Sequence, residues 1–220
     1  MVSSISQYRW GKDSTFVNNV DNIERYLLED GHLIWGFVIY RCTYESDDDW
    51  NKLMKQLRQD VKECLETYNG LDMEKRVRIT AIEDKSILKD ASTSFVREHF
   101  RQWTATAPQR EQGEGVGPGL SQRYQFCLQV DDAALDAIVH DISEIGQSDA
   151  GFVNLIWKDW EPNAPGQMDE GEEDIEGCTQ HDVGWIMVAF HGVMVDMYNL
   201  LRDSNDWLRE YRRPLEVVRP

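Results

Sequence analysis

The segment 167–182, QMDEGEEDIEGCTQHD, gathers side chains whose types and spacing could bind a metal ion. Cys178 and His181 are separated by two residues, and Glu176 or Asp182 could supply a third ligand. Structural zinc sites usually take two ligand pairs at set spacings, and no second CxxC or HxxxH pair is present. The carboxylates also differ in order from those of a calcium-binding EF-hand loop. We therefore expect no metal ion and no cofactor, with Cys178 and His181 as the residues to examine, and we interpret the segment as a solvated loop.

Polar side chains inside otherwise apolar segments form a second set of candidates. Burying a polar group costs free energy unless it is hydrogen-bonded, so several such groups on one sheet are typical of a cavity. In such a cavity His191 would act as an acid or base and Arg41 would hold an anion. The alternative is that these groups lie on a half-exposed face or satisfy one another in the core. The residues expected to bind a ligand are Arg41, Gln125, Asn154, Trp185 and His191.

Recognised catalytic and phosphate-binding motifs are missing from the sequence. The glycine-rich run 113–119, GEGVGPG, follows a predicted helix and precedes a predicted strand, which reverses the order found in phosphate-binding loops. No G-x-S-x-G, H-E-x-x-H or protein-kinase set occurs. Cys42 or Cys127 could serve as a nucleophile only if a histidine folded beside it. We interpret the glycine-rich run as a linker.

Composition and charge limit the partners. The chain has 220 residues, a formal net charge of −17 and a pI near 4.6, so we expect no binding to nucleic acid or to an anionic membrane. No apolar run is long enough for a membrane span, and the N-terminal residues lack the apolar core of a signal peptide. The cysteines are widely spaced and are expected to be free thiols, which favours a cytoplasmic location.

Hydrophobic periodicity predicts a chain in which strands and helices alternate. Apolar, β-branched and aromatic runs predict strands at 35–44, 76–84, 123–130, 151–160 and 184–194. Helical spacing and capping residues predict helices at 18–31, 46–69, 92–103, 131–142 and 195–214. Flexible loops are expected at about 107–121 and 161–183. Within the helix 92–103, the residues expected on the buried face are Phe95, Val96, Phe100 and Trp103.

This order of elements predicts a single α+β domain, 1–220. It resembles the βαββαβ core of ferredoxin-like proteins. We therefore expect a ferredoxin-like sandwich with a mainly antiparallel sheet, helices on one face, and a C-terminal strand-helix extension. In that extension Trp207, Leu208 and Tyr211 recur at helical spacing, so they either dock on the core of the protein or form the seam of a homodimer.

Two segments carry a resemblance to a known group of proteins. The segment 184–218, GWIMVAFHGVMVDMYNLLRDSNDWLREYRRPLEVV, together with WGFVIYRCTY at 35–44, resembles a family of uncharacterised intracellular proteins of filamentous fungi. The resemblance covers most of the chain from Trp35 onward, with the acidic segment as a region of variable length. It implies a single domain and a fungal source, and it brings no activity or catalytic residue with it.

Three functions are compatible with the sequence. The first is a binding protein for a small molecule or a protein partner. The second is a small-molecule enzyme of the αβ-barrel type, such as an isomerase, cyclase or oxygenase, in which His191 and Arg41 converge on one cavity. The third is an acidic docking or mimic protein that acts through the segment 159–182, where carboxylates occur without any Lys or Arg.

Overall fold

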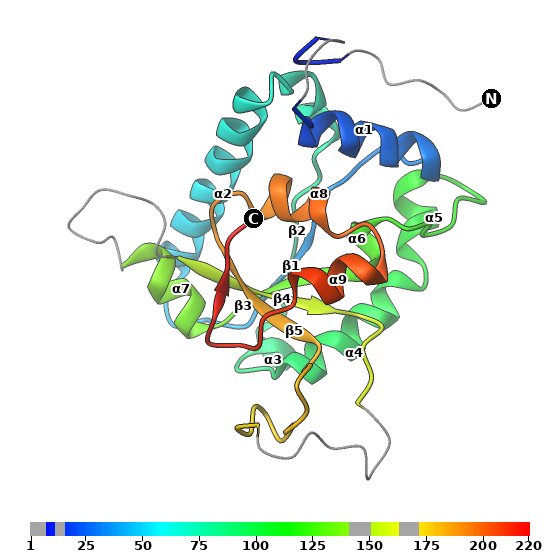
Figure 1. Cartoon of the computed structure of the whole chain (residues 1–220). Coiled ribbons are helices and arrows are strands. Elements are labelled where there is room, and N and C mark those ends of the chain that lie inside the picture. Colours follow the sequence, from blue (N-terminus) through cyan, green and yellow to red (C-terminus); the bar gives the residue numbers. More distant parts are fainter. Residues whose placement is uncertain (1–7, 12–15, 141–150, 163–171) are drawn as a thin grey trace.

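The computed structural model of the chain describes residues 8–11, 16–140, 151–162 and 172–220 (Figure 1). Its strands are β1 (Val38–Arg41), β2 (Thr80–Ile82), β3 (Phe126–Val130), β4 (Phe152–Trp157), β5 (Trp185–Ala189) and β6 (Val217–Val218). Its helices are α1 (Asn19–Asp30), α2 (Asp47–Thr67), the 3-10 helix η1 (Leu71–Arg76), α3 (Lys85–Leu88), α4 (Thr93–Thr104), α5 (Ala107–Gln112), α6 (Gln122–Gln125), α7 (Asp132–Val139), the π-helix η2 (Val193–Met197), α8 (Tyr198–Leu200) and α9 (Ser204–Glu210). None of these described helices has the length and apolar character needed to span a membrane.

The strands of the described residues form one six-stranded sheet in the order β2-β1-β3-β4-β5-β6. β1 runs parallel to both β2 and β3, and β5 runs parallel to β6. Between them β3, β4 and β5 form an antiparallel meander. The first parallel pair follows from its connection, because α2 crosses from β1 to β2 and returns the chain to the same end of the sheet.

The expected fold class is confirmed at its coarser level, because the protein is α+β with a mixed sheet. The ferredoxin-like topology is not confirmed, since three of the five strand pairings are parallel. The expectation of helices on one face is wrong. Alternate residues of the strands pack against α2 and α7 on one face and against α4 on the other, so apolar helix faces cover both sides of the sheet.

Alternation along β1 separates the two parts of the core. Phe37 and Ile39 pack with the helices on one face, whereas Val38 packs with Phe100 of α4 on the other. Phe95, expected on the buried face of α4, is instead exposed. The helix turns Phe95 away because the face that meets the sheet is set by its other apolar residues, one turn apart.

The starts of four helices predicted from capping residues, at 18, 46, 92 and 131, are confirmed. The side chain of Asn18 accepts hydrogen bonds at the start of α1, and Gly31 ends that helix in the left-handed conformation, at φ 68°. Ser46 caps α2 by accepting a hydrogen bond from Asp49 N. Asp131 caps α7, and the predicted end of that helix near residue 142 lies outside the described residues.

The predicted loop at 107–121 begins with the helix α5. Pro108 lies in its first turn, where the missing N–H of proline costs no helical hydrogen bond. The predicted strand 123–130 starts only at Phe126, because residues 122–125 form α6. Gln125 therefore belongs to a helix and not to the sheet.

The C-terminal region also differs from the prediction. β5 ends at Ala189, so His191 lies in the turn after the strand. The helical tail starts as η2, and the single helix predicted at 195–214 is interrupted after α8, so that α9 begins with its own cap at Asp203. Trp207 and Tyr211 are buried in the core of this chain, as expected if the tail docks there, but Leu208, expected beside them, is exposed. The short strand β6 has no counterpart in the predicted elements.

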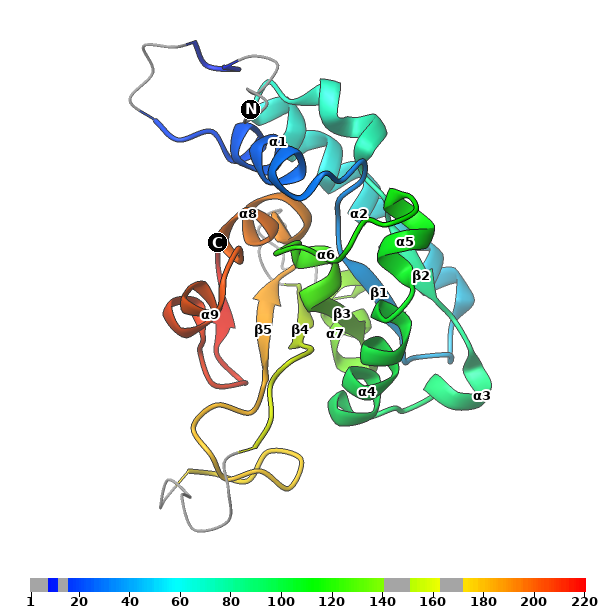
Figure 2. The same ribbon diagram turned by 90° about the vertical axis from the view of Figure 1, so that its right-hand side faces the viewer.

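Residues 172–183, which belong to the predicted loop 161–183, project beyond the ends of β4 and β5 (Figure 2). Arg213 of the C-terminal tail donates hydrogen bonds to the carbonyl oxygens of Glu173, Gln180 and His181. These contacts use backbone acceptors and tie the segment to the tail. The remaining residues of the predicted loop, 163–171, lie outside the described residues.

Arg123 holds one end of the sheet through buried polar contacts. Its guanidinium donates to the carbonyl oxygens of Gly36 and Arg78, which belong to the chain entering β1 and β2. Its Nη2 lies 2.7 Å from Glu111 Oε1 on α5, and its side chain has no exposed surface. Removing one partner of a buried ion pair leaves the other charge without compensation, which is far costlier than losing an exposed pair.

We expect Arg123→Met to lower the free energy of unfolding by about 3–5 kcal/mol, because Glu111 would remain partly buried without a cation. Urea denaturation followed by circular dichroism measures this loss. The control is Arg25→Met, which removes an exposed partner of Glu29 and is expected to cost less than about 0.5 kcal/mol. Equal losses in the two variants would contradict the role of Arg123.

Candidate metal-binding site

Arg41, the predicted anion anchor, is already paired with carboxylates at the end of β1. Its Nη2 lies 2.5 Å from Asp47 Oδ1, and its Nη1 lies 3.3 Å from Glu83 Oε2. The guanidinium also lies 4.6 Å from the ring centre of Tyr44 and 5.2 Å from that of Trp50. Two carboxylates and two aromatic rings therefore compensate the charge that an anionic ligand would require.

His191, the predicted acid or base, lies elsewhere. Its Nδ1 is 2.5 Å from Asp60 Oδ1, and 51% of its side chain is exposed. Asp47, which contacts Arg41, and Asp60 are thirteen residues apart on α2, which corresponds to about 20 Å along the helix axis. His191 and Arg41 therefore do not converge, and the cavity on which the enzyme hypothesis depended is not formed by them.

The other predicted ligand-binding residues are also separate. Gln125 lines a cavity of about 490 Å³ beside α5. Asn154 is buried on β4, where its Nδ2 donates to Asp131 Oδ2 at 2.8 Å. Trp185 packs against the core on the α4 side of the sheet. A hydrogen bond to Asp131 thus accounts for the buried amide of Asn154, and the five predicted residues do not line one cavity.

Cys178 and His181 lie in the projecting segment. The backbone of Cys178 pairs with that of Ile175, and His181 Nδ1 lies 3.2 Å from Glu172 Oε1. Among the described residues, neither belongs to a group of three metal-ligating side chains. The spacing that first indicated a metal site therefore has no third ligand beside it in this part of the chain.

A different group has the geometry of a metal site. Asp60, Cys64 and His191 each place one ligating atom within 4.8 Å of the others. Asp60 and Cys64 are four residues apart on α2, so they lie on one face of the helix, and both are buried. His191 approaches that face from the turn after β5. A carboxylate, a thiol and an imidazole are ligands that zinc commonly uses.

The turn after β5 is shaped to bring His191 to α2. Gly192 has φ 77°, and its N–H donates to Asp60 Oδ2 at 3.1 Å. A Cβ at this position would lie 2.7 Å from Asp196 Oδ2 and would also strain the left-handed backbone. The chain then turns directly into the π-helix η2, a form of helix often found at functional sites. The positive φ and the closeness of Asp196 thus favour glycine in this turn, which places the N–H of residue 192 against Asp60.

A second layer of hydrogen bonds supports the turn. Asp196 Oδ1 accepts from the hydroxyl of Tyr68 at 2.6 Å and from Asn19 Nδ2 at 2.7 Å. Tyr68 ends α2, and Asn19 begins α1. The group is therefore held between two helices whose positions are set by the core, and such outer contacts fix the orientation of metal ligands.

Burial shifts the pKa values of both acidic groups at this site. Burial raises the pKa of Asp60, although the neighbouring His191 and the N–H of Gly192 oppose that change. Burial also raises the pKa of the Cys64 thiol. Both groups thus resist ionisation when only His191 is present. A divalent ion would compensate both charges and displace both protons.

One feature of the sequence indicated this site, but the apolar repeat of α2 drew attention away from it. Asp60 is the only carboxylate among the buried residues of α2, and it lies in an otherwise apolar stripe. An unpaired buried carboxylate requires a partner, so its position alone indicated a site. Nothing local could identify that partner, because His191 is 131 positions away along the chain.

Comparison of the chain with family models, with curated proteins and with solved structures finds no match.

The pH dependence of stability tests the electrostatics of Asp60. Because its folded-state pKa is raised, Asp60 contributes stability below its unfolded pKa and loses that contribution as the pH rises through the folded pKa. We therefore expect the unfolding free energy of the wild-type chain, relative to that of Asp60→Asn, to fall as the pH rises from about 4. Urea titrations of both proteins at a series of pH values measure this difference.

Asp49, on the same helix, is the control with the opposite sign. Its hydrogen bond with Lys52 lowers the pKa of the Asp49 carboxyl to about 2, so its contribution is lost as the pH falls. The stability of the wild type relative to Asp49→Asn should thus rise with pH over the acid range. If the difference for Asp60→Asn also rose with pH, the ion pair with His191 would outweigh burial, contrary to our assignment.

Proposed function

We propose that this protein is a binding protein whose ligand is a divalent transition-metal ion of the zinc class, held by Asp60, Cys64 and His191. The supporting observation is the approach of three ligating atoms to within 4.8 Å of one another. Ligands of a tetrahedral zinc ion lie roughly 3.5 Å apart. The three atoms therefore lie near the separation of metal ligands, with a short contact between Asp60 and His191.

The types of ligand select the ion. Magnesium and calcium prefer shells made of oxygen atoms, which Cys64 and His191 cannot supply. Thiolate and imidazole suit zinc and its neighbours among the late first-row metals. The single carboxylate adds a third ligand that is common in such sites. The donor set thus supports a zinc-class ion and argues against a hard cation.

The number and exposure of the ligands suggest an exchangeable ion. Structural zinc sites are usually closed by four protein ligands, whereas this group offers three. His191 is half-exposed, so solvent reaches the site from its side. An ion held here would keep a position for water or for a small exogenous ligand. With such an open position the chain would be a binding protein and not only a fold stabilised by a metal ion.

The other two functions remain as alternatives to this proposal. The pair formed by Asp60 and His191 would support an acid–base enzyme if no metal binds, because a carboxylate orients the imidazole. The acidic docking function is supported less, because several carboxylates of the segment 159–182 have internal partners. Glu172 contacts Arg213, Glu176 contacts Thr93, and Asp182 accepts from the indole of Trp207.

The proposal does not depend on the finer expectations from the sequence. A ferredoxin-like topology, a fungal source, a cytoplasmic location and a homodimer all remain predictions. The site needs only α2, the turn after β5, and the mixed sheet that places them side by side.

Titration with Co²⁺ tests the metal site. Coordination of Co²⁺ by a thiolate produces an intense charge-transfer band in the near ultraviolet. We expect the wild-type chain to show this band with one equivalent of Co²⁺, and Zn²⁺ to displace it. Cys64→Ser should abolish the band, and Asp60→Asn or His191→Gln should weaken Zn²⁺ binding by about tenfold or more. Binding should also strengthen with pH, since the thiol of Cys64 must lose its proton.

Cys178→Ser is the matched control, because it removes the other cysteine that was considered as a metal ligand. It should leave the Co²⁺ band unchanged, and so should His181→Gln. A band lost in Cys178→Ser but kept in Cys64→Ser would contradict the proposed site. Absence of any thiolate band in the wild type would leave Asp60 and His191 as an ion pair and would favour the acid–base alternative.

A further inference from the structure

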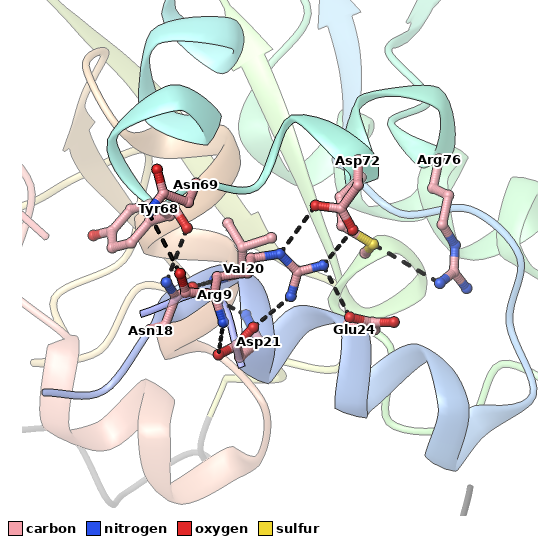
Figure 3. Close-up of polar contacts among 10 residues, drawn as sticks. Arg9, Asn18, Val20, Asp21, Glu24, Tyr68, Asn69, Asp72 and Arg76 are labelled. Carbon is pink, nitrogen blue, oxygen red and sulfur yellow. Dashed lines mark hydrogen bonds and ion pairs between the residues drawn. The ribbon is translucent and has the colours of Figure 1, made fainter. Parts of the chain in front are cut away.

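Arg9 inserts its guanidinium among three carboxylates that come from two helices (Figure 3). Its Nε and Nη2 donate to the two oxygens of Asp72 at 3.1 and 2.6 Å. Its Nη1 lies 2.5 Å from Asp21 Oδ1, and its Nη2 also donates to Glu24 Oε2 at 2.9 Å. The side chain of Arg9 has no exposed surface. Burial opposes its charge, but hydrogen bonds to Asp72, Asp21 and Glu24 outweigh burial and raise the pKa of Arg9.

The two elements that surround Arg9, α1 and η1, are held in place by contacts that do not involve Arg9. Asp21 and Glu24 lie on α1, which is anchored in the core by residues such as Val20 and Ile23. Asp72 lies on η1, which is anchored by Met73. Gly70 brings the two elements together, because a Cβ there would lie 2.7 Å from Val20 Cγ1. We name the three carboxylates Asp21, Glu24 and Asp72 the arginine receptor.

The arginine receptor requires a cation that it does not itself contain. Three carboxylates face one guanidinium, so negative charge is in excess even with Arg9 in place. Arg76 lies nearby, but its guanidinium donates to the carbonyl oxygens of His32 and Leu33. The carboxylates without Arg9 would repel one another at close range.

The residues beside Arg9 make a second, independent contact. The ring centre of Trp10 lies 5.5 Å from that of Tyr68, at the end of α2. Asn69 Nδ2 donates to the carbonyl oxygen of Arg9 at 3.4 Å, and Gly11 N donates to that of Tyr8 at 2.9 Å. Residues 8–11 thus bind as a short turn, with an arginine in an acidic pocket and an aromatic ring on a neighbouring surface.

We infer that the arginine receptor and Tyr68 form a peptide-recognition site that residues 8–11 occupy in cis, and that its ligand in trans is a partner segment carrying arginine followed by an aromatic residue. This inference is independent of the proposed metal site. The geometry selects arginine over lysine. A guanidinium presents several donors in a fixed fork, which binds both oxygens of Asp72 and still reaches Asp21 and Glu24, whereas an ammonium is a point charge.

The test uses the full-length chain with Arg9→Ala, which vacates the receptor, and a labelled Tyr-Arg-Trp-Gly peptide followed by fluorescence anisotropy. We expect saturable binding to Arg9→Ala. Binding to the wild-type chain should be at least about tenfold weaker, because a tethered segment competes at an effective concentration in the millimolar range. A Tyr-Lys-Trp-Gly peptide should also bind Arg9→Ala at least about tenfold more weakly.

Three results would overturn the inference: no saturable binding to folded Arg9→Ala, equal binding to Arg9→Ala and the wild type, or equal binding of the lysine and arginine peptides. The last two would indicate attraction to an acidic surface only. Asp72→Asn supplies a second test that does not require removal of Arg9. It should expose the bond after Arg9 to trypsin and speed its cleavage about tenfold or more, as measured by mass spectrometry. Unchanged cleavage would also overturn the inference.

Discussion

The burial of one apolar stripe of α2 against the sheet is the constraint on which the other features depend. The stripe brings Leu57 and Val61 into the core and, because it repeats every three to four residues, carries Asp60 and Cys64 inward with them. The start of the helix lies beside Arg41, and its end presents Tyr68 to Asp196 of η2. A different rotation of α2 would expose the candidate metal ligands and remove Tyr68 from Asp196.

Buried charge is the second recurring feature of this acidic protein. The side chains of Arg123 and Arg9 are fully buried; Arg123 is compensated by one carboxylate, Glu111, and Arg9 by three. Asp60 is buried with a weaker partner, since the imidazole of His191 is half-exposed and carries a full charge only when protonated. Uncompensated buried charge is costly. This contrast is a physical reason to assign a metal ion to the site of Asp60, whereas the two buried arginines already have carboxylates beside them.

The candidate metal site and the arginine receptor meet at Tyr68. Its hydroxyl donates to Asp196, which supports the turn carrying His191, and its ring contacts Trp10 of the N-terminal segment. Asn19 also links the two sites. It begins α1, which carries two carboxylates of the arginine receptor, and its side chain donates to Asp196. The end of α2 and the start of α1 are therefore where the two proposed binding functions share structure, on the upper side of the molecule as drawn in Figure 1.

Local chemistry in the sequence determined the caps and faces of the long helices. Asn18, Gly31 and Ser46 act within one turn of their own positions, so their roles were readable from the sequence. The sequence likewise showed most strands and the absence of known catalytic motifs. The tertiary structure alone decided the parallel pairing of β1 with β3, the two-residue strand β6, and the meeting of His191 with Asp60. These features depend on contacts between residues far apart in the chain. The free energy of such contacts is gained only when the whole sheet and its helices assemble. The hydrophobic pattern of a single segment therefore does not predict them.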